Sequence, residues 1–381
     1  MLKTTDTYRE IQQQPSVWKK TFDIVKDVST DFKRFIKAIE DNESTDKFKV
    51  IFTGAGSSAY VGDIARMAVD NNKFPKWSFE SVPTTHFVTN PGTYIDDATT
   101  YLVVSFARSG NSPETQGTVE LFNQLSQHVY HVFITNNKDG FLGRYTDTEN
   151  AFKVILPDET NDKSLAMTSS FSTMLLAACL LFSSEEIDEA YFKRVEQNFS
   201  WIDAHAREVA AQPFKKIFYA GTGMQGELTK EVSLKLNELT AGAIEIAKET
   251  TLGFRHGPKA GLNDNALFIM LRGANDYQRR YEADVIHEID IPERNYQILV
   301  LDGKASDDAF TFTFPNAEHD SDLELTLEYL IFGQLLAFYK SVQLGLNPDN
   351  PSPNGFINRV VKGVTIYPFE LKTQYSRRRA C

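Results

Sequence analysis

Short apolar runs rich in β-branched residues alternate along the chain with longer segments whose apolar residues recur at helical spacing. This alternation is typical of a parallel β-sheet whose strands are joined by crossover helices. The strands that we predict are residues 49–53, 101–105, 129–135, 152–156, 216–220, 266–271, 297–301 and 310–314. They fall into two groups, so the predicted fold class is α/β with two units.

The two groups of strands share a local pattern. The sequence KVIFTGAG at 49–56 aligns with KIFYAGTG at 216–223, and each is an apolar run that ends on G-x-G. The apolar run at 100–105 aligns with that at 266–271 at nearly the same spacing. Two copies of one α/β unit therefore account for most of the chain.

We expect four segments around this repeat. They are a helical N-terminal arm at 1–47, a first α/β domain at 48–190, a second at 210–348 and a tail at 349–381. A helical stretch near 183–212 joins the two domains. The tail is predicted to be rich in loops because NPSPNG lies near its start.

Composition and charge exclude some classes of partner. The 381 residues carry a formal net charge of −11, and the one basic cluster is Arg377 to Arg379. A nucleic-acid binding protein needs a basic stripe, so we do not expect one here. An acidic protein that binds a phosphorylated metabolite needs local donors, which should be visible as a motif.

The sequence indicates a cytoplasmic protein without membrane spans. The first twenty residues lack the apolar stretch of a signal peptide. The apolar segment at 165–182 carries five hydroxyl residues in one half, which favours a buried helix. Two cysteines, Cys179 and Cys381, suggest neither a disulfide framework nor a cysteine metal site.

The first glycine turn has two ordinary interpretations. Gly54, Gly56 and Ala59 satisfy the loose dinucleotide-binding pattern, and Glu80 lies at about the right distance to bind a ribose hydroxyl. A tight bend of small residues between strand and helix would also explain the glycines. Neither interpretation needs the two serines that follow.

A phosphate-binding turn explains those serines. Ser57 and Ser58 follow the glycines, and a second serine turn follows the next strand. Its candidate ligands are Ser105 at the strand's end, Ser109 and Ser112 in the turn, and Thr115 in the first turn of the next helix. Hydroxyl and N–H groups at helix N-termini bind phosphate, and two such turns can face each other at the carboxyl edge of one sheet. We therefore favour a phosphate over a dinucleotide.

The motifs GAGSSAY at 54–60 and RSGNSPET at 108–115 resemble the sugar isomerase (SIS) family, whose domains bind phosphorylated sugars through these turns. The motifs ELTAG, GFRHGPK and NRVVKGV, at 238–242, 253–259 and 358–364, resemble the AgaS branch of galactosamine-6-phosphate deaminases or tagatose-6-phosphate ketose/aldose isomerases. The resemblance implies two tandem SIS domains, each a flavodoxin-like parallel sheet flanked by helices. It extends to the isomerase module of glucosamine-6-phosphate synthase. We expect no ammonia transfer from glutamine, because that enzyme's glutaminase domain and cysteine nucleophile have no counterpart here.

Lys235 and Glu238 stand three residues apart and share one face of a predicted helix. An exposed ion pair is the ordinary interpretation, but Leu234, Leu236 and Leu239 indicate that this part of the helix is buried. The resemblance implies that Glu238 is the base that moves a proton between C1 and C2 of the open sugar. It also implies that Lys235 steadies charge on the sugar oxygens.

His256 lies in FRHGPK, where Gly257 and Pro258 constrain the backbone. The resemblance implies that this histidine passes a proton to the ring oxygen and so opens the cyclic sugar. In some members of the family it acts across a subunit interface. We therefore expect a homo-oligomer, at least a dimer.

The resemblance also supplies contacts to the sugar. Lys362 matches a lysine that forms a Schiff base in the synthase module, a step that a deaminase does not need, so we expect a sugar contact. LAMTSSF at 165–171 aligns with the loop that lines the sugar, and it contributes Ala166 and Thr168 as candidates. Glu249 is either a second acid or sugar ligand, or a solvated charge.

One departure from the family pattern concerns the second serine turn. Phe106 and Ala107 lengthen it, so Ser109 is a firmer candidate for the phosphate than Ser105.

The expected activity is conversion of galactosamine 6-phosphate to tagatose 6-phosphate and ammonia. Aldose–ketose isomerisation without deamination is one alternative. A sugar-phosphate sensor is another, although residues 1–47 offer no basic recognition helix for DNA. The sequence contains no HExxH, no paired cysteines and no calcium-type loop, so we expect neither a metal nor a redox cofactor.

Overall fold

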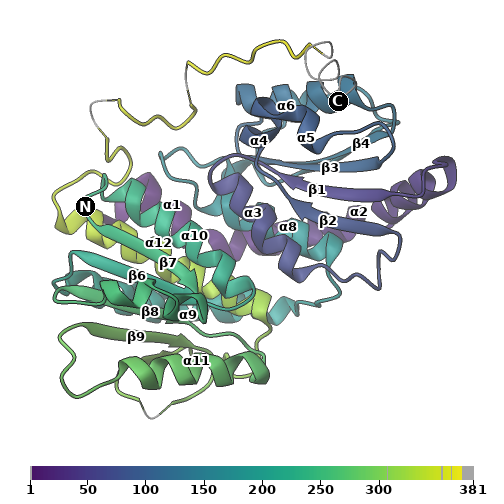
Figure 1. The fold of residues 1–381 in the computed structure, drawn as a ribbon. Coiled ribbons are helices and arrows are strands. Elements are labelled where there is room, and N and C mark those ends of the chain that lie inside the picture. The colour runs from purple at the N-terminus through teal and green to yellow at the C-terminus, as the bar shows by residue number, and fades with distance from the viewer. Residues whose placement is uncertain (1, 307, 353–354, 362, 371–381) are drawn as a thin grey trace, which may run out of the picture.

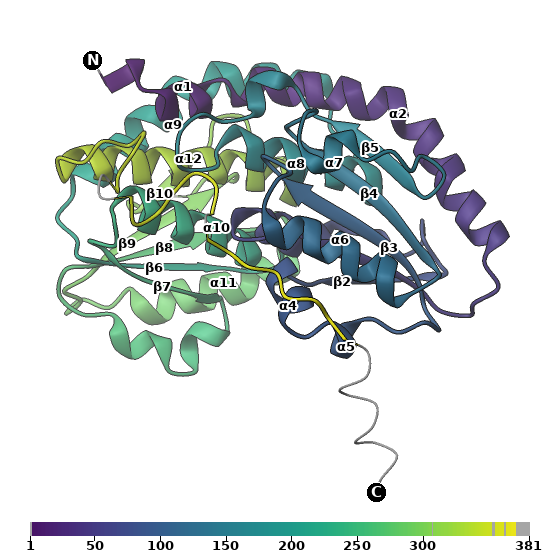
Figure 2. The same ribbon diagram turned by 90° about the horizontal axis from the view of Figure 1, so that it is seen from above.

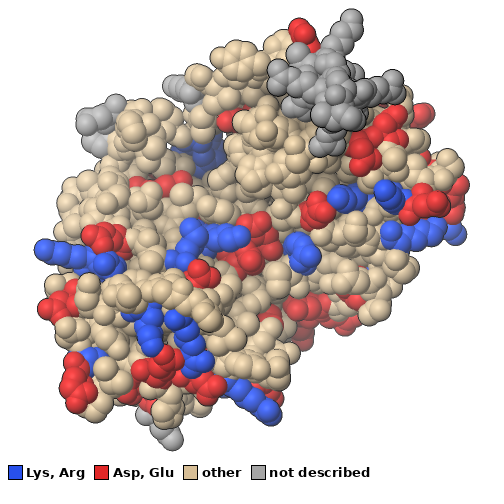
Figure 3. Space-filling model, in the orientation of Figure 1, with Lys and Arg blue, Asp and Glu red and all other residues tan. Residues whose placement is uncertain are grey.

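The computed structural model of the chain describes residues 2–306, 308–352, 355–361 and 363–370 (Figure 1). It contains two α/β halves with an N-terminal helical arm, as the sequence predicts. On the face seen in Figure 3, basic and acidic side chains are interspersed without a continuous basic surface. None of the helices in the described part has the length and hydrophobicity needed to cross a bilayer.

The first half is built on a parallel sheet in the order β2-β1-β3-β4-β5. Its strands are β1 (Phe48–Thr53), β2 (Trp77–Ser81), β3 (Thr100–Ala107), β4 (Val129–Thr135) and β5 (Ala151–Ile155). Its helices are α3 (Ser57–Ala68), α4 (Thr84–Thr89), α5 (Pro91–Tyr94), α6 (Pro113–Leu125), α7 (Phe141–Arg144), η2 (Asp158–Thr160) and α8 (Ser169–Phe182). This strand order is that of flavodoxin-like sheets, which confirms the predicted fold class.

The second half repeats the same topology, in the order β10-β9-β8-β6-β7. Its strands are β6 (Lys216–Gly221), β7 (Glu245–Thr250), β8 (Ala266–Leu271), β9 (Gln297–Asp302) and β10 (Thr311–Thr313). Its helices are α10 (Met224–Leu239), η3 (Gly253–Arg255), η4 (Pro258–Gly261), α11 (Asp276–Ile289) and α12 (Asp322–Gln343). Helix α9 (Glu189–Ala211) joins the halves.

The N-terminal arm packs across both halves. It consists of η1 (Leu2–Thr4), α1 (Asp6–Gln12) and α2 (Gln14–Asn42). Tyr8 of α1 contacts Phe338 of α12, and Phe32 of α2 contacts Phe152 of β5. One buried hydrophobic cluster includes residues of the arm, of both sheets and of α8, α9, α10 and α12, so the two halves share a core.

Two of the ten strands among the described residues were not predicted. Both missed strands, β2 and β7, lie at sheet edges and pair with one neighbour only. Strand β7 has the sequence EIAKET and is partly or fully exposed throughout, so it has no continuous apolar run. A third difference is that β3 continues to Ala107, which places Phe106 and Ala107 in the strand and not in the serine turn.

The two halves meet through α3 and α10, which run antiparallel. Ser57 at the start of α3 contacts Lys235 near the end of α10, and Asp63 further along α3 pairs with Lys230, earlier in α10, at 2.7 Å. This packing places the carboxyl edge of the first sheet beside the amino edge of the second, because α3 begins after β1 and α10 ends before β7.

The C-terminal segment crosses from the second half to the first (Figures 1 and 2). Gln124 of α6 donates a hydrogen bond to the Phe369 carbonyl at 3.1 Å, and Phe369 packs beside the cluster that contains Phe87 and Phe122. Lys362, the predicted sugar contact in this segment, lies outside the described residues.

Candidate active site

The first serine turn lies where the strand order of the first sheet reverses, between β1 and β3. Ligands of open α/β sheets bind at this point, outside the carboxyl ends of the strands. Gly56 begins α3 with φ 57°, which favours glycine, and it provides no side-chain cap. Gly54 lies so close to Ser58 that a Cβ would be 2.5 Å from the Ser58 carbonyl carbon. The turn therefore requires both glycines and brings Ser57 to the helix start.

Gly223 repeats this geometry in the second half, with φ 60° and ψ −129° against 57° and −128° at Gly56. Met224 and Gln225 follow it in place of serines. The two turns are therefore alike in backbone and different in chemistry.

The second serine turn follows β3 on the neighbouring strand. Ser112 caps α6 by accepting a hydrogen bond from the Thr115 N–H at 3.2 Å, and its Oγ is 2.7 Å from Thr115 Oγ1. The Ser109 carbonyl accepts a hydrogen bond from Asn137 at 2.8 Å. Ser105 is buried inside β3, two residues before its end, and does not close the strand as predicted.

Helix α10 brings Lys235 to the first serine turn. Lys235 is fully buried, and its Nζ donates hydrogen bonds to Ser57 Oγ at 3.0 Å and to Glu238 Oε2 at 2.6 Å. The Lys235 Nζ to Glu231 Oε1 distance is 3.5 Å. Glu231, Lys235 and Glu238 thus form one row along α10, and the Glu238 side chain is 24% exposed at its open end.

The charges in this row depend on one another. Burial by itself lowers the pKa of Lys235, but the negative charges of Glu231 and Glu238 outweigh it, so the pKa lies above its ordinary value. Burial and the charge of Glu238 raise the pKa of Glu231, whereas the charge of Lys235 lowers it. The net result is a pKa of about 7. The two carboxylates therefore favour the charged form of Lys235, which can orient Glu238 and stabilise negative charge.

The segment 161–168 overlaps the stretch 165–171 that the resemblance predicts to line the sugar, and for this reason we call it the sugar loop. It lies next to the first serine turn. Ser58 Oγ is 3.9 Å from Met167 Sδ. The buried Asp162 carboxylate accepts hydrogen bonds from the Thr168 N–H at 2.7 Å and the Ser170 N–H at 2.9 Å, at the start of α8. Ala166 is fully buried. Thr168 Oγ1 is buried and has no hydrogen-bond partner among the described residues.

The sugar loop is held from three sides. Glu10 of α1 accepts hydrogen bonds from the Lys163 N–H, the Ser164 N–H and the Ser164 hydroxyl. Arg108, which precedes Ser109, donates to the Ser164 and Leu165 carbonyls. Arg359 of the C-terminal segment donates to the Asp162 carbonyl at 2.7 Å and to Asn161 Oδ1 at 2.7 Å.

His256 and Glu249 lie at the carboxyl edge of the second sheet, opposite the amino edge where Glu238 lies. Glu249 is near the end of β7, and its Oε1 accepts a hydrogen bond from the Thr250 N–H at 2.8 Å. His256 follows on the exposed turn after η3. Glu238 precedes β7, so the length of a six-residue strand, roughly 20 Å, separates it from His256 in one chain. The structure therefore brings Ser57, Lys235 and Glu238 together and leaves His256 apart from them.

Sequence reasoning missed several buried charged residues around this site, among them Glu10, Asp162, Glu231 and Arg108. Glu231 stands four residues before Lys235, and this spacing could have revealed it as part of the row. Arg108 lies inside the RSGNSPET motif, but sequence patterns do not show which carbonyls an arginine reaches. Glu80, the candidate for a dinucleotide ribose, instead pairs with Lys49 at 2.9 Å.

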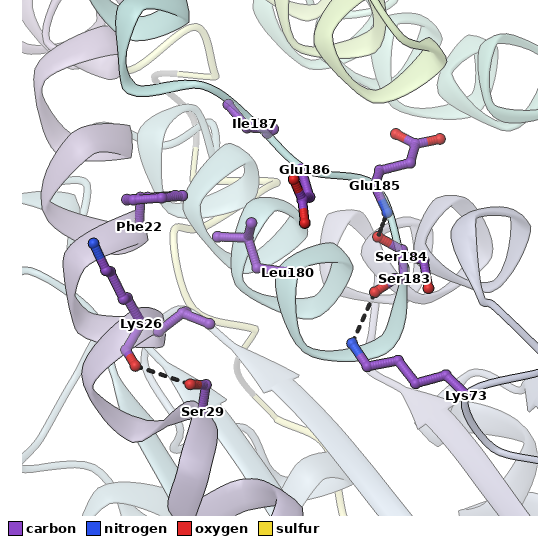
Figure 4. Close-up of a pocket in the computed structure, with 11 residues that line it drawn as sticks. Phe22, Lys26, Ser29, Lys73, Leu180, Ser183, Ser184, Glu185, Glu186 and Ile187 are labelled. Atoms are coloured by element: carbon purple, nitrogen blue, oxygen red, sulfur yellow. Dashed lines mark hydrogen bonds between the residues drawn. The ribbon is translucent and has the colours of Figure 1, made fainter.

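A separate cavity of about 500 Å³ lies between α2, the end of α8 and the start of the connection to α9 (Figure 4). Lys73 borders it and donates a hydrogen bond to the Ser183 carbonyl at 2.9 Å. None of the predicted site residues lines this cavity. Within the described residues, no group of three or more His, Cys, Asp or Glu side chains could hold a metal ion.

Comparisons with known proteins identify the family of this chain. The SIS domain family matches residues 45–184. D-galactosamine-6-phosphate deaminase AgaS of Escherichia coli is 34% identical over 96% of both chains, and the Shewanella protein of that name is 34% identical over 95% of this chain and 92% of its own. The crystal structure of Escherichia coli tagatose-6-phosphate ketose/aldose isomerase is 31% identical, with a TM-score of 0.86 over 96% of this chain and 97% of the other.

These similarities show that the chain belongs to the SIS family of sugar-isomerase domain proteins and contains two tandem domains of that fold. Its place within the family is the AgaS group, because the match to AgaS proteins extends over nearly the whole length of both chains.

Proposed function

We propose that this protein deaminates and isomerises an amino-sugar phosphate, galactosamine 6-phosphate, to form tagatose 6-phosphate and ammonia. The observation that carries the proposal is the junction of Ser57, Lys235 and Glu238 at the switch point of the first sheet. Relatives named for the deaminase and the isomerase support this choice of substrate class.

In the proposed site the substrate's phosphate binds to the two serine turns. Ser57 accepts a hydrogen bond from Lys235 and also interacts with Glu231. We propose that the Ser57 hydroxyl proton turns from Glu231 to a phosphate oxygen when the substrate binds. No side chain caps the α3 N-terminus, so a bound anion meets the helix start directly. The Ser58 and Ala59 N–H groups donate to the Ala55 and Gly56 carbonyls at 3.2 and 3.0 Å, so the anion would share or displace these bonds. Ser58 and Ser109 complete this part, with Ser105, Ser112 and Thr115 as further candidates.

Glu238 is the proposed base. After the ring opens to the aldehyde, Glu238 removes the proton from C2 and returns one to C1, which converts the amino aldose to a ketimine with nitrogen at C2. Lys235 stabilises the negative charge that develops on O1 during this transfer. One water then adds to C2, ammonia leaves, and the ketose phosphate remains, so the net reaction is hydrolytic. Ala166, Thr168 and Lys362 are proposed to contact the sugar.

His256 is proposed to open the ring from a second copy of the chain. The His256 turn is exposed and stands about the length of a strand away from Glu238 in its own chain. A homo-oligomer in which this turn covers the partner's site supplies the missing acid. Glu249 lies beside the same turn and is proposed to enter the partner's site with it.

The test is ammonia release from a panel of hexosamine 6-phosphates, with tagatose 6-phosphate and fructose 6-phosphate measured as products. We expect release that is fastest from galactosamine 6-phosphate. No release from any amino sugar, together with active aldose–ketose interconversion, would make the protein an isomerase. Binding of sugar phosphates without turnover of any of them would make it a sensor.

A further inference from the structure

The side chain of Arg108 connects three segments that meet at the candidate site. Arg108 lies between β3 and Ser109 and is 6% exposed. Its Nη1 donates to the Ser164 carbonyl at 3.3 Å and the Leu165 carbonyl at 3.2 Å. Its Nη2 donates to the Arg359 carbonyl at 2.6 Å. One guanidinium therefore ties the second serine turn to the sugar loop and to the C-terminal segment.

Only an arginine can make this set of contacts. The guanidinium is planar and carries five N–H donors in a fixed fork, whereas a lysine ammonium is a single point with flexible reach. Within the described residues, the three hydrogen bonds of Arg108 all go to backbone carbonyls, so its direct partners are carbonyl dipoles. Burial and the nearby charge of Arg359 lower the pKa of Arg108 to about 10, which leaves it charged at neutral pH.

The contacts of the C-terminal segment extend this connection. Arg359 donates to Asn161 and Asp162, so the segment holds the same loop whose carbonyls Arg108 reaches. The Leu165 N–H donates to the Asp349 carbonyl at 3.2 Å, where the segment begins. A shift of the sugar loop would therefore move the C-terminal segment with it. Both segments are bonded to Arg108, whose charge interacts with those of Lys235 and Glu238.

We infer that Arg108 is a positioning residue for the proposed reaction: its guanidinium fork holds the sugar loop and the C-terminal segment at a fixed place relative to the phosphate turn. The inference rests on the proposed function. Arg108 is not a catalytic residue in it, because it acts through backbone carbonyls. A displacement of about 1 Å at a reacting centre can cost a hundredfold in rate, which gives such a clamp a kinetic effect.

Two substitutions test the guanidinium geometry and the positive charge of Arg108 separately. R108K keeps the charge and loses the fork, and R108Q loses both. We expect kcat to fall by about 10–100-fold in both variants, with KM for the sugar phosphate changed less than about threefold. Hydrogen exchange in 161–168 and 355–361 should become faster in both. Wild-type kinetics in R108K with an inactive R108Q would overturn the inference, because charge alone would then suffice.

R194K is the matched control. Arg194 is a partly buried arginine, with its side chain 18% exposed, that also donates to a carbonyl, that of Asn316, and it lies on α9 away from the site. R194K should lower thermal stability at least as much as R108K and leave kcat unchanged. An equal loss of kcat in R194K, or unchanged exchange in R108K, would reduce Arg108 to a structural role. The exchange data need no turnover, so they remain decisive if wild-type protein releases no ammonia and the proposed function fails.

Discussion

Lys235 of the second half donates a hydrogen bond to Ser57 of the first half at 3.0 Å, across 178 positions of sequence. The donor is the cation that also holds Glu238, and the acceptor begins the helix that follows the first glycine turn. Through Lys235, the proposed base Glu238 is thus connected to the proposed phosphate turn. Substitutions at either end should therefore affect both stability and chemistry.

Replacing the buried cation should be costly. K235M leaves the fully buried Glu231 without its ion-pair partner, and removing one member of a buried pair typically costs about 3–5 kcal/mol. We expect a loss of about 3 kcal/mol in unfolding free energy, measured with urea, and a loss of turnover. The double variant K235M/E231Q should recover much of the stability and none of the turnover. Recovered turnover would show that Lys235 serves folding alone.

Glu238 should matter for rate more than for stability. E238Q removes the proposed base, which should lower kcat by about 10²–10⁴-fold and leave binding of a sugar phosphate measurable. Glu227 offers a matched control: it lies on the same helix, three residues before Lys230, with a 2.6 Å ion pair and 28% exposure. E227Q should leave kcat within about twofold. Unchanged turnover in E238Q would remove Glu238 from the chemistry.

Activity should return when two inactive variants are mixed. H256A and E238Q are each expected to be inactive, because one lacks the acid and the other lacks the base. Unfolding and refolding them together should restore about a quarter of wild-type activity, since half of the dimers are mixed and each has one intact site. The double variant E238Q/H256A, treated alone, is the control. No recovery in the mixture would mean that His256 does not act across an interface.

Stability should fall as the pH rises toward neutrality. The pKa of Glu231 is about 7 in the folded chain, against an ordinary value of 4.5. Between these values the unfolded chain releases the proton and the folded chain keeps it, so the free energy of unfolding decreases with pH. Burial raises the pKa of Glu10 and of Glu282 to about 7 as well, which adds to the same trend.

The contribution of Glu231 can be isolated with E231Q. Urea unfolding of wild-type and variant protein between pH 4.5 and pH 8 should give a smaller fall in the variant, by on the order of 2 kcal/mol. An identical slope in both proteins would mean that Glu231 ionises in the folded chain at its ordinary pKa.

Much of the fold was predictable because its signals are local. The run before Gly54 and Gly56 predicts a buried strand and a tight turn, and the same signals recur before Gly221 and Gly223. Two of the four edge strands in the described part, β2 and β7, were missed, and in β7 the exposure of the strand removes the apolar run. The glycine turns and the Lys235–Glu238 spacing were also visible, since each involves neighbours on one turn or helix face.

The sequence by itself determined the two repeated sheets, the serine turns and the presence of Lys235, Glu238 and His256. Only the tertiary structure decided which of these residues meet. Antiparallel packing of α3 on α10 brings Lys235 to Ser57, and the direction of β7 carries His256 to the opposite end of the sheet. Periodicity and turn preferences act over a few residues, whereas the orientation of the two halves follows from burying the faces of helices far apart in the chain.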